Sequence, residues 1–236
     1  MKRIFLLLCI PIFTTVSTLQ SQTWFEIGIK GGPATSVLVN NNIFDDTQFD
    51  HSFLPSYFFG GKLGVNFGES NGVALHVGMT KVQQAFNNNY PGATFDRRRF
   101  ESNVLEIGLL YHRTKSAGYF EIGPRISLVQ DGTIADDGGT PQDFSEHLAS
   151  PYYGLDLGFG SYFIGGEHLS LLAGFRFSYG FSPIASSERE LAPVTANYDT
   201  EGGVHVLTAM LSFELNYSLG YLVRSSCGRR TAWISF

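Results

Sequence analysis

The stretch LSLLAGFRFSYGF, residues 169–181, alternates between two kinds of side chain over its whole length. Its even-numbered positions are mostly small or polar, and hold Ser, Gly and Arg with a single Leu. Its odd-numbered positions are all apolar or aromatic, namely Leu169, Leu171, Ala173, Phe175, Phe177, Tyr179 and Phe181. A period of two indicates a β-strand, because successive side chains of a strand point to opposite faces. This strand therefore separates two different surroundings.

The same alternation recurs along the chain, for example in YYGLDLGFGSYF at 152–163 and LTAMLSFELNY at 207–217. We predict eight strands, at residues 24–38, 53–67, 73–86, 99–112, 119–131, 151–163, 169–183 and 204–223. The connections between them alternate between long polar segments and short turns. Long loops at one end and short turns at the other are typical of an outer-membrane β-barrel.

The composition of the 236-residue chain also favours a membrane barrel. Charged residues make up 16% of the chain, below the roughly 25% of soluble domains, while aromatic residues reach 14% and there are 27 glycines. A closed barrel satisfies every backbone hydrogen bond within a membrane, so a spanning helix is not needed. We therefore predict an all-β protein, an eight-stranded antiparallel up-and-down transmembrane β-barrel. A soluble lipocalin-like ligand-binding barrel would place the apolar face inside and is the competing architecture.

The first 21 residues of the chain predict that the protein is exported. Lys2 and Arg3 precede an apolar run at 4–13 and a small polar stretch at 14–21, the pattern of a cleaved signal peptide. We assign residues 1–21 to this peptide, 22–223 to the barrel and 224–236 to a C-terminal tail, and we place the protein in the cell outer membrane. Cleavage leaves 14 basic against 21 acidic residues, a balance that argues against a nucleic-acid partner.

The triplet Glu-Ile-Gly occurs three times, at residues 26–28, 106–108 and 121–123. Strand parity sends each Ile to lipid and each Glu and Gly into the lumen. By the same parity we predict a lumen charge network made of Glu26, Lys30, Lys62, His76, Glu106, Glu121, Arg125, Asp156, Arg176 and Glu214. Its members should form ion pairs, because an unpaired buried charge costs several kcal/mol. A structural plug is the interpretation we favour, and a proton- or ion-responsive gate is the alternative.

Other motifs are weaker. Ser145, Glu146 and His147 are consecutive, but catalytic triads are recognised by spatial geometry rather than by sequence adjacency. The segment DGTIADDGG at 131–139 lacks the spacing of a calcium loop. We therefore predict no catalytic residues, no cofactor and no metal. Arg97, Arg98 and Arg99 lie where the fourth strand meets the long loops, and guanidinium groups bind phosphates in a bidentate way. They are candidate contacts for lipopolysaccharide, with a plain solvated rim as the alternative.

Three segments carry a resemblance to a known family: FEIGIKGG at 25–32, GLDLGFG at 154–160 and LSFELNYSLGYLV at 211–223. With the signal peptide and the repeated Glu-Ile-Gly, they make residues 22–223 resemble the PorT-like outer-membrane β-barrel family. The resemblance implies outer-membrane residence and no catalytic residues, and one branch of that family is tied to protein secretion. The basic tail departs from the usual ending of such barrels.

These observations lead to a functional expectation. We expect a non-enzymatic, monomeric barrel that contacts outer-membrane lipids and lipopolysaccharide and meets a protein partner through its long loops, as a secretion accessory or a surface-interaction protein. One alternative is an enzyme that modifies lipid A at the outer rim, for which His51 or His147 would be essential. The other is the soluble lipocalin-like barrel, which would be recovered in the soluble fraction.

Overall fold

The computed structural model describes residues 23–45, 49–68, 70–89, 96–137, 139–166, 168–187, 202–221 and 234–235. The predicted signal peptide, residues 1–21, lies outside the described residues, as does the predicted tail except for its residues 234–235. Among the residues that the structure describes, no helix combines the length and the apolarity needed to cross a membrane.

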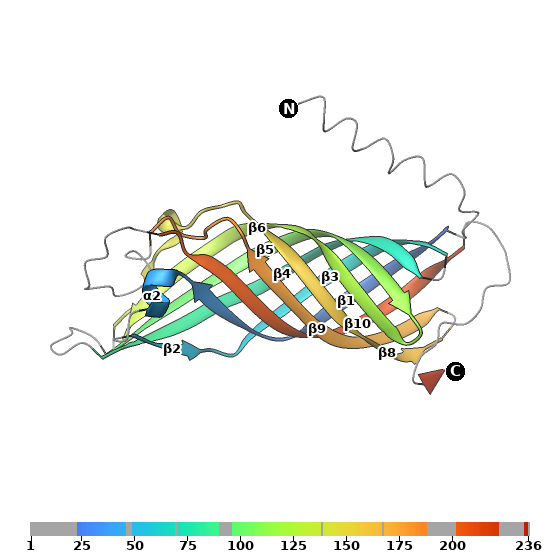
Figure 1. Cartoon of the computed structure of the whole chain (residues 1–236), viewed down its shortest axis with the longest axis horizontal. Coiled ribbons are helices and arrows are strands. Elements are labelled where there is room, and N and C mark those ends of the chain that lie inside the picture. Colours follow the sequence, from blue (N-terminus) through green and yellow to red (C-terminus); the bar gives the residue numbers. More distant parts are fainter. Residues whose placement is uncertain are drawn as a thin grey trace, which may run out of the picture.

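Eight long strands form the wall of a barrel (Figure 1). They are β1 (Thr23–Val39), β3 (Ser56–Phe67), β4 (Asn71–Asn88), β5 (Arg97–Lys115), β6 (Gly118–Asp136), β8 (Tyr152–Gly165), β9 (Leu169–Gly180) and β10 (His205–Tyr221). Each pairs antiparallel with the next in this order, and β10 returns to pair with β1. The ring is therefore closed, and the predicted eight-stranded antiparallel barrel is confirmed.

Several strands extend beyond their predicted bounds at the long-loop end. β2 (Phe49–Phe53) pairs with the last residues of β4, and β3 pairs with the first ones, so both lie along the same neighbour. Pro55 lies in the gap between β2 and β3, and proline cannot donate to a strand ladder. The helix α2 (Asn41–Asp45), the short strand β7 (Gln142–Asp143) and the 3-10 helix η2 (Ser145–His147) lie in the long connections of this end. The long-loop end therefore has secondary structure of its own.

The outer face of the wall is an apolar belt. On β10 the outward row includes Leu207, Phe213, Leu215 and Leu219, each at least 37% exposed. Tyrosines mark both edges of the belt: Tyr57, Tyr153 and Tyr179 at the long-loop edge, and Tyr111 and Tyr217 at the short-turn edge. An apolar band bordered by aromatic residues is the lipid-facing surface of an outer-membrane barrel. Beyond Leu105 the outward positions of β5 change to Asn103, Glu101 and Arg99, which marks the outer boundary of the belt.

The chain ends close to the short-turn end. β10 and β1 stay paired as far as Trp24 and Tyr221, with one register shift between Phe25 and Glu26, so β10 completes the barrel. A two-residue strand, β11 (Ile234–Ser235), then pairs in parallel with Ile164 and Gly165 at the end of β8. The last described residues thus lie against the rim of the barrel, at the opposite end from α2 and β2 (Figure 1).

Candidate functional site

All ten residues of the predicted network point into the lumen and are at most 4% exposed. They come from all eight wall strands, and each occupies the inward parity of its strand. The strands bring them into two connected clusters, one centred on a lysine and one on two arginines. We call the two clusters together the charged layer.

Lys62 of β3 is the centre of the first cluster. Its Nζ lies 2.8 Å from Oε1 of Glu26 on β1 and forms a second ion pair with Glu214 on β10. The side-chain amide of Asn216 also donates to Glu214, at 2.6 Å. The three strands are neighbours in the order β3, β1, β10, so this cluster spans the place where the barrel closes.

Arg125 and Arg176 organise the second cluster. Arg125 donates to Glu106, and its Nε lies 3.5 Å from Oδ1 of Asp156. Arg176 lies 3.2 Å from Glu121 and 3.8 Å from Asp156. The two arginines therefore share Asp156, which ties β6 and β9 together through β8.

Several smaller contacts complete the charged layer. His76 on β4 lies 3.3 Å from Nη1 of Arg176, and the hydroxyl of Thr80 donates to Glu106 at 2.9 Å. Lys30 lies 4.0 Å from Glu121 and so connects the two clusters, but its Nζ makes no hydrogen bond to the described residues. Gly154 makes room for this packing, because a Cβ there would lie 2.6 Å from the carbonyl oxygen of Tyr179. The five acidic and four basic side chains of the charged layer therefore lie together in the lumen and compensate most of one another's charge.

A second interior layer, which the sequence reasoning did not predict, closes the long-loop end. It is an apolar core, here called the apolar cap, built of Leu38, Ile43, Val82, Phe86, Phe100, Val104, Phe144, Leu148, Tyr152, Ile184, Ala185, Val204 and Val206. Phe144 and Leu148 belong to the connection between β6 and β8, and Phe144 meets Phe100 edge to face with ring centroids 6.4 Å apart. Ile184 and Ala185 follow β9. The long connections are thus folded onto the mouth of the barrel. The sequence signal from which this core could have been predicted is the presence of apolar residues at inward positions of β4 and β5, such as Val82 and Phe100.

The three arginines at the start of β5 have different neighbours. Arg98 forms a bidentate pair with Asp136 of β6, at 2.6 and 3.0 Å. Arg99 pairs with Glu101 at 2.6 Å, and Lys81 of β4 contacts the same carboxylate at 2.6 Å. Arg97 is exposed. Carboxylates of the chain therefore hold two of the three guanidinium groups, and the lipopolysaccharide contact stays a prediction.

The residues of the sequence SEH lie in η2 and make local contacts. The hydroxyl of Ser145 donates to Asp143 at 2.7 Å, and the backbone N–H of Ser145 donates to the same carboxylate at 3.0 Å. These hydrogen bonds lower the pKa of Asp143 from its usual value. The His147 ring stacks on Phe144 with centroids 4.8 Å apart. This arrangement is that of a structured turn on the apolar cap.

His51, the other histidine considered for an enzyme, lies in β2. Its ring stacks on Phe44 of α2, with centroids 4.6 Å apart, and its Nδ1 lies 2.7 Å from the amide nitrogen of Gln84. The two histidines therefore belong to different elements, each with its own aromatic partner. Among the described residues, no group of three or more His, Cys, Asp or Glu side chains is arranged to hold a metal ion.

Comparison with known proteins adds a family. A family model described as "Outer membrane protein beta-barrel domain" matches residues 20–186. Similar solved structures include Neisserial surface protein A (16% identity, 82% of this chain and 96% of that chain, TM-score 0.41). They also include Ail of Yersinia pestis with the heparin analogue sucrose octasulfate (12% identity, 83% of this chain and 99% of that chain, TM-score 0.41). A third is OprG of Pseudomonas aeruginosa (13% identity, 85% of this chain and 99% of that chain, TM-score 0.41). No curated protein matches the chain.

Proposed function

The chain belongs to the outer membrane β-barrel domain family and is an outer-membrane protein, and from this premise we propose that its barrel anchors a folded binding surface on the cell exterior. In this proposal the barrel neither conducts nor catalyses, and the protein acts as a monomer. Its partner is a macromolecule that meets the long-loop end. Long loops of outer-membrane barrels face outward, and short turns face the periplasm.

The apolar cap is the observation that carries the proposal. Phe144, Leu148 and Ile184 attach two long connections to inward side chains of the strands. Burial of such side chains stabilises a fixed arrangement by about 1.5–3 kcal/mol for each fully buried residue. The outer surface is therefore a preorganised one, and a preorganised surface binds with a smaller loss of conformational entropy.

The charged layer supports the absence of conduction. An open path would require several of the buried pairs around Lys62, Arg125 and Arg176 to separate. Breaking a buried ion pair by removing one partner costs about 3–5 kcal/mol, because a charge is left uncompensated. An eight-stranded barrel is also only wide enough to be filled by side chains. The charged layer is thus better suited to a plug than to a pore.

A secretion accessory is the second version of this proposal, and it rests on the PorT-like resemblance of residues 22–223. In that version the partner is a protein of the cell's own export system. Deletion of the gene would then reduce the amount of secreted protein in the medium. A surface-interaction protein predicts unchanged secretion and reduced attachment to external surfaces.

The main test measures attachment of intact cells to immobilised proteins and polysaccharides. Leu148→Asp places a charge in the apolar cap and should abolish attachment, while the unboiled protein still migrates as a folded barrel in electrophoresis. Lys115→Asp, at the exposed last residue of β5 beside the short turn, is the matched control and should retain attachment. Equal attachment by both variants would contradict a role for the folded outer surface.

Conduction is tested separately in planar lipid bilayers with the purified protein. We expect no stepwise current at neutral pH. Discrete and reproducible conductance steps would contradict the anchor proposal and would favour the gate interpretation of the charged layer.

A further inference from the structure

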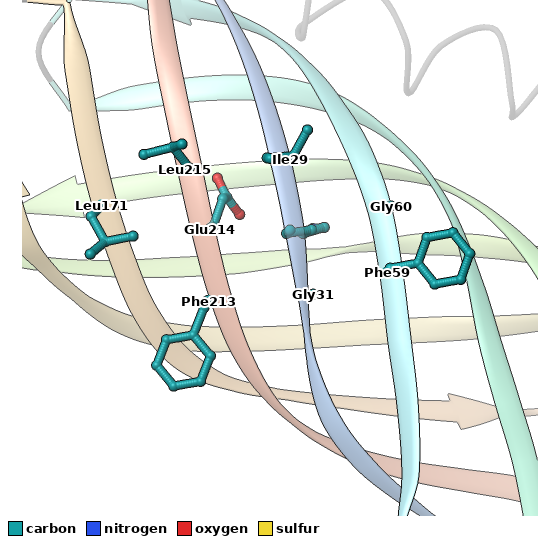
Figure 2. Close-up of a pocket in the computed structure, with 9 residues that line it drawn as sticks. Ile29, Gly31, Phe59, Gly60, Leu171, Phe213, Glu214 and Leu215 are labelled. Atoms are coloured by element: carbon teal, nitrogen blue, oxygen red, sulfur yellow. The ribbon is translucent and has the colours of Figure 1, made fainter.

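The lipid-facing wall contains a hollow of about 450 Å³ (Figure 2). Its lining residues come from the four consecutive strands β9, β10, β1 and β3 and are Ile29, Lys30, Gly31, Phe59, Gly60, Leu171, Phe213, Glu214 and Leu215. Figure 2 shows Phe59 and Phe213 on either side of β1, with Ile29 further along β1 and Leu215 further along β10. We call this feature the wall hollow.

The wall hollow follows from one glycine and its register. Gly31 lies at an outward position of β1 and is paired with Phe213 on one side and Phe59 on the other. Glycine carries no side chain, so two aromatic side chains, 49% and 57% exposed, stand around a bare stretch of backbone. The other outward residues of the lining, Ile29, Leu171 and Leu215, are aliphatic. The result is an apolar depression in an otherwise continuous belt.

The depth of the hollow in the membrane identifies the part of a lipid that reaches it. Phe213 is the middle residue of the outward row of β10, which runs from Leu207 to Leu219. The hollow therefore lies near the middle of the apolar belt on β10, while on β3 its Phe59 stacks on Tyr57 of the long-loop edge, with ring centroids 6.5 Å apart. Hydrocarbon chains occupy this level of a bilayer.

The charges beside the hollow belong to the lumen. Lys30 and Glu214 border it, but both are buried, at 4% and 2% exposed, and Glu214 is engaged by Lys62. The hollow thus presents no charged group to the outside, and a headgroup or a charged peptide would find no partner in it. An unfilled depression would lose dispersion contacts on every wall, so a flexible hydrocarbon chain gains by filling it.

From these observations we propose that the wall hollow binds one acyl chain of a membrane lipid and holds that lipid on the barrel. The hollow is continuous with the lipid-facing belt, which selects a lipid chain over a soluble ligand. A bound chain would cover the bare backbone of β1 directly outside the Lys62 cluster. This inference needs the outer-membrane location alone and is independent of what the long loops bind.

The test is native mass spectrometry of the full-length protein released from detergent after incubation with a bacterial phospholipid extract. The wild type should retain one phospholipid. Leu215→Trp fills the hollow from β10 and should lower retention roughly tenfold, which corresponds to about 1.4 kcal/mol of binding free energy. Leu219→Trp is the matched control, because Leu219 is outward on the same strand, 60% exposed and not part of the lining. It should retain the lipid as the wild type does.

Each sample is first checked for its heat-dependent shift in electrophoresis, which reports an intact barrel. If Leu215→Trp does not fold, Leu171→Trp replaces it, since Leu171 lines the hollow from β9. Retention by the filled variant equal to that of the wild type would overturn the proposal, and so would a wild type without bound lipid. A protein dimer that Leu215→Trp dissociates would assign the hollow to a second copy and would also overturn it.

Discussion

The two interior layers of this barrel have opposite chemistry, and β5 passes through both. In the charged layer its inward residue Glu106 lies between the outward Leu105 and Ile107. In the apolar cap its inward residue Phe100 lies between the outward Arg99 and Glu101. At these two positions the inside of the strand is polar where the outside faces lipid, and apolar where the outside faces water; Leu110, inward at the lipid level, is an exception. The medium outside the wall thus decides which face of a strand carries the apolar residues.

The largest effect is expected in the charged layer, from Arg125→Met. The substitution leaves Glu106 and Asp156 buried without their common cation, so the free energy of unfolding should fall by about 3–5 kcal/mol. Urea unfolding in lipid vesicles measures this loss. Arg125→Lys keeps the positive charge, so its free energy of unfolding should fall by less. A loss below 1 kcal/mol would show that the charged layer does not stabilise the barrel.

In the apolar cap, we expect Phe100→Ala to have a different effect. Removal of this buried ring costs about 3–5 kcal/mol where the site cannot collapse. We expect the loss to be confined to the cap: protease cleavage in the connection between β6 and β8 should accelerate, while the heat-dependent electrophoretic shift stays unchanged. If the shift is lost as well, the cap and the membrane barrel form one cooperative unit.

At the rim of the apolar cap, Arg98→Ala should lower the free energy of unfolding only slightly. The pair between Arg98 and Asp136 is half-exposed, and exposed ion pairs contribute about 0.2–1 kcal/mol. The same urea experiment, repeated at high salt, should give an even smaller difference because salt screens exposed charges. A loss as large as that of Arg125→Met would remove the distinction between buried and exposed pairs drawn here.

The smallest effect concerns the turn at η2 and its pH dependence. Hydrogen bonds from Ser145 lower the pKa of Asp143 below its usual 3.8. A lowered folded-state pKa stabilises the turn above pH 3.8, and this contribution is lost as the pH falls through the lowered value. Order in the turn should therefore be constant from pH 7 to about pH 4 and fall below it. Ser145→Ala removes the hydroxyl but keeps the backbone N–H, so it should move the pKa of Asp143 part of the way back up in a carboxyl NMR titration, and an unchanged pKa would exclude the hydroxyl as a cause.

Much of the fold could be predicted from the period of two. The alternation at residues 169–181 is clear because lipid and lumen impose different side chains on the two faces. The pairs inside the lumen could not be predicted in this way, since Lys62 and Glu214 are 152 residues apart and their meeting depends on strand register. Parity assigns a residue to a face but does not name its neighbour on another strand.

The apolar cap was missed for a different reason. Val82 and Phe100 occupy inward positions, and their apolar nature appeared only as a weaker alternation near the strand ends. Phe144 and Leu148 lie in a connection without any period, so no local pattern assigned them to a core. Recognition of the cap required the closed topology, which brings β1, α2, β4, β5, β8, β10 and the connections after β6 and β9 to one end of the barrel.

The cluster around Lys62 has a consequence for the assembly of the barrel. β3 is the next wall strand after β1, so Lys62 can meet Glu26 early, whereas Glu214 arrives only when the final strand closes on the first. Pairings between such distant residues form slowly. A slip of one residue at this seam would turn Glu214 toward lipid and separate it from Lys62. The charge of Glu214 therefore selects the register of the last strand. Only the native register buries this carboxylate beside its partner Lys62.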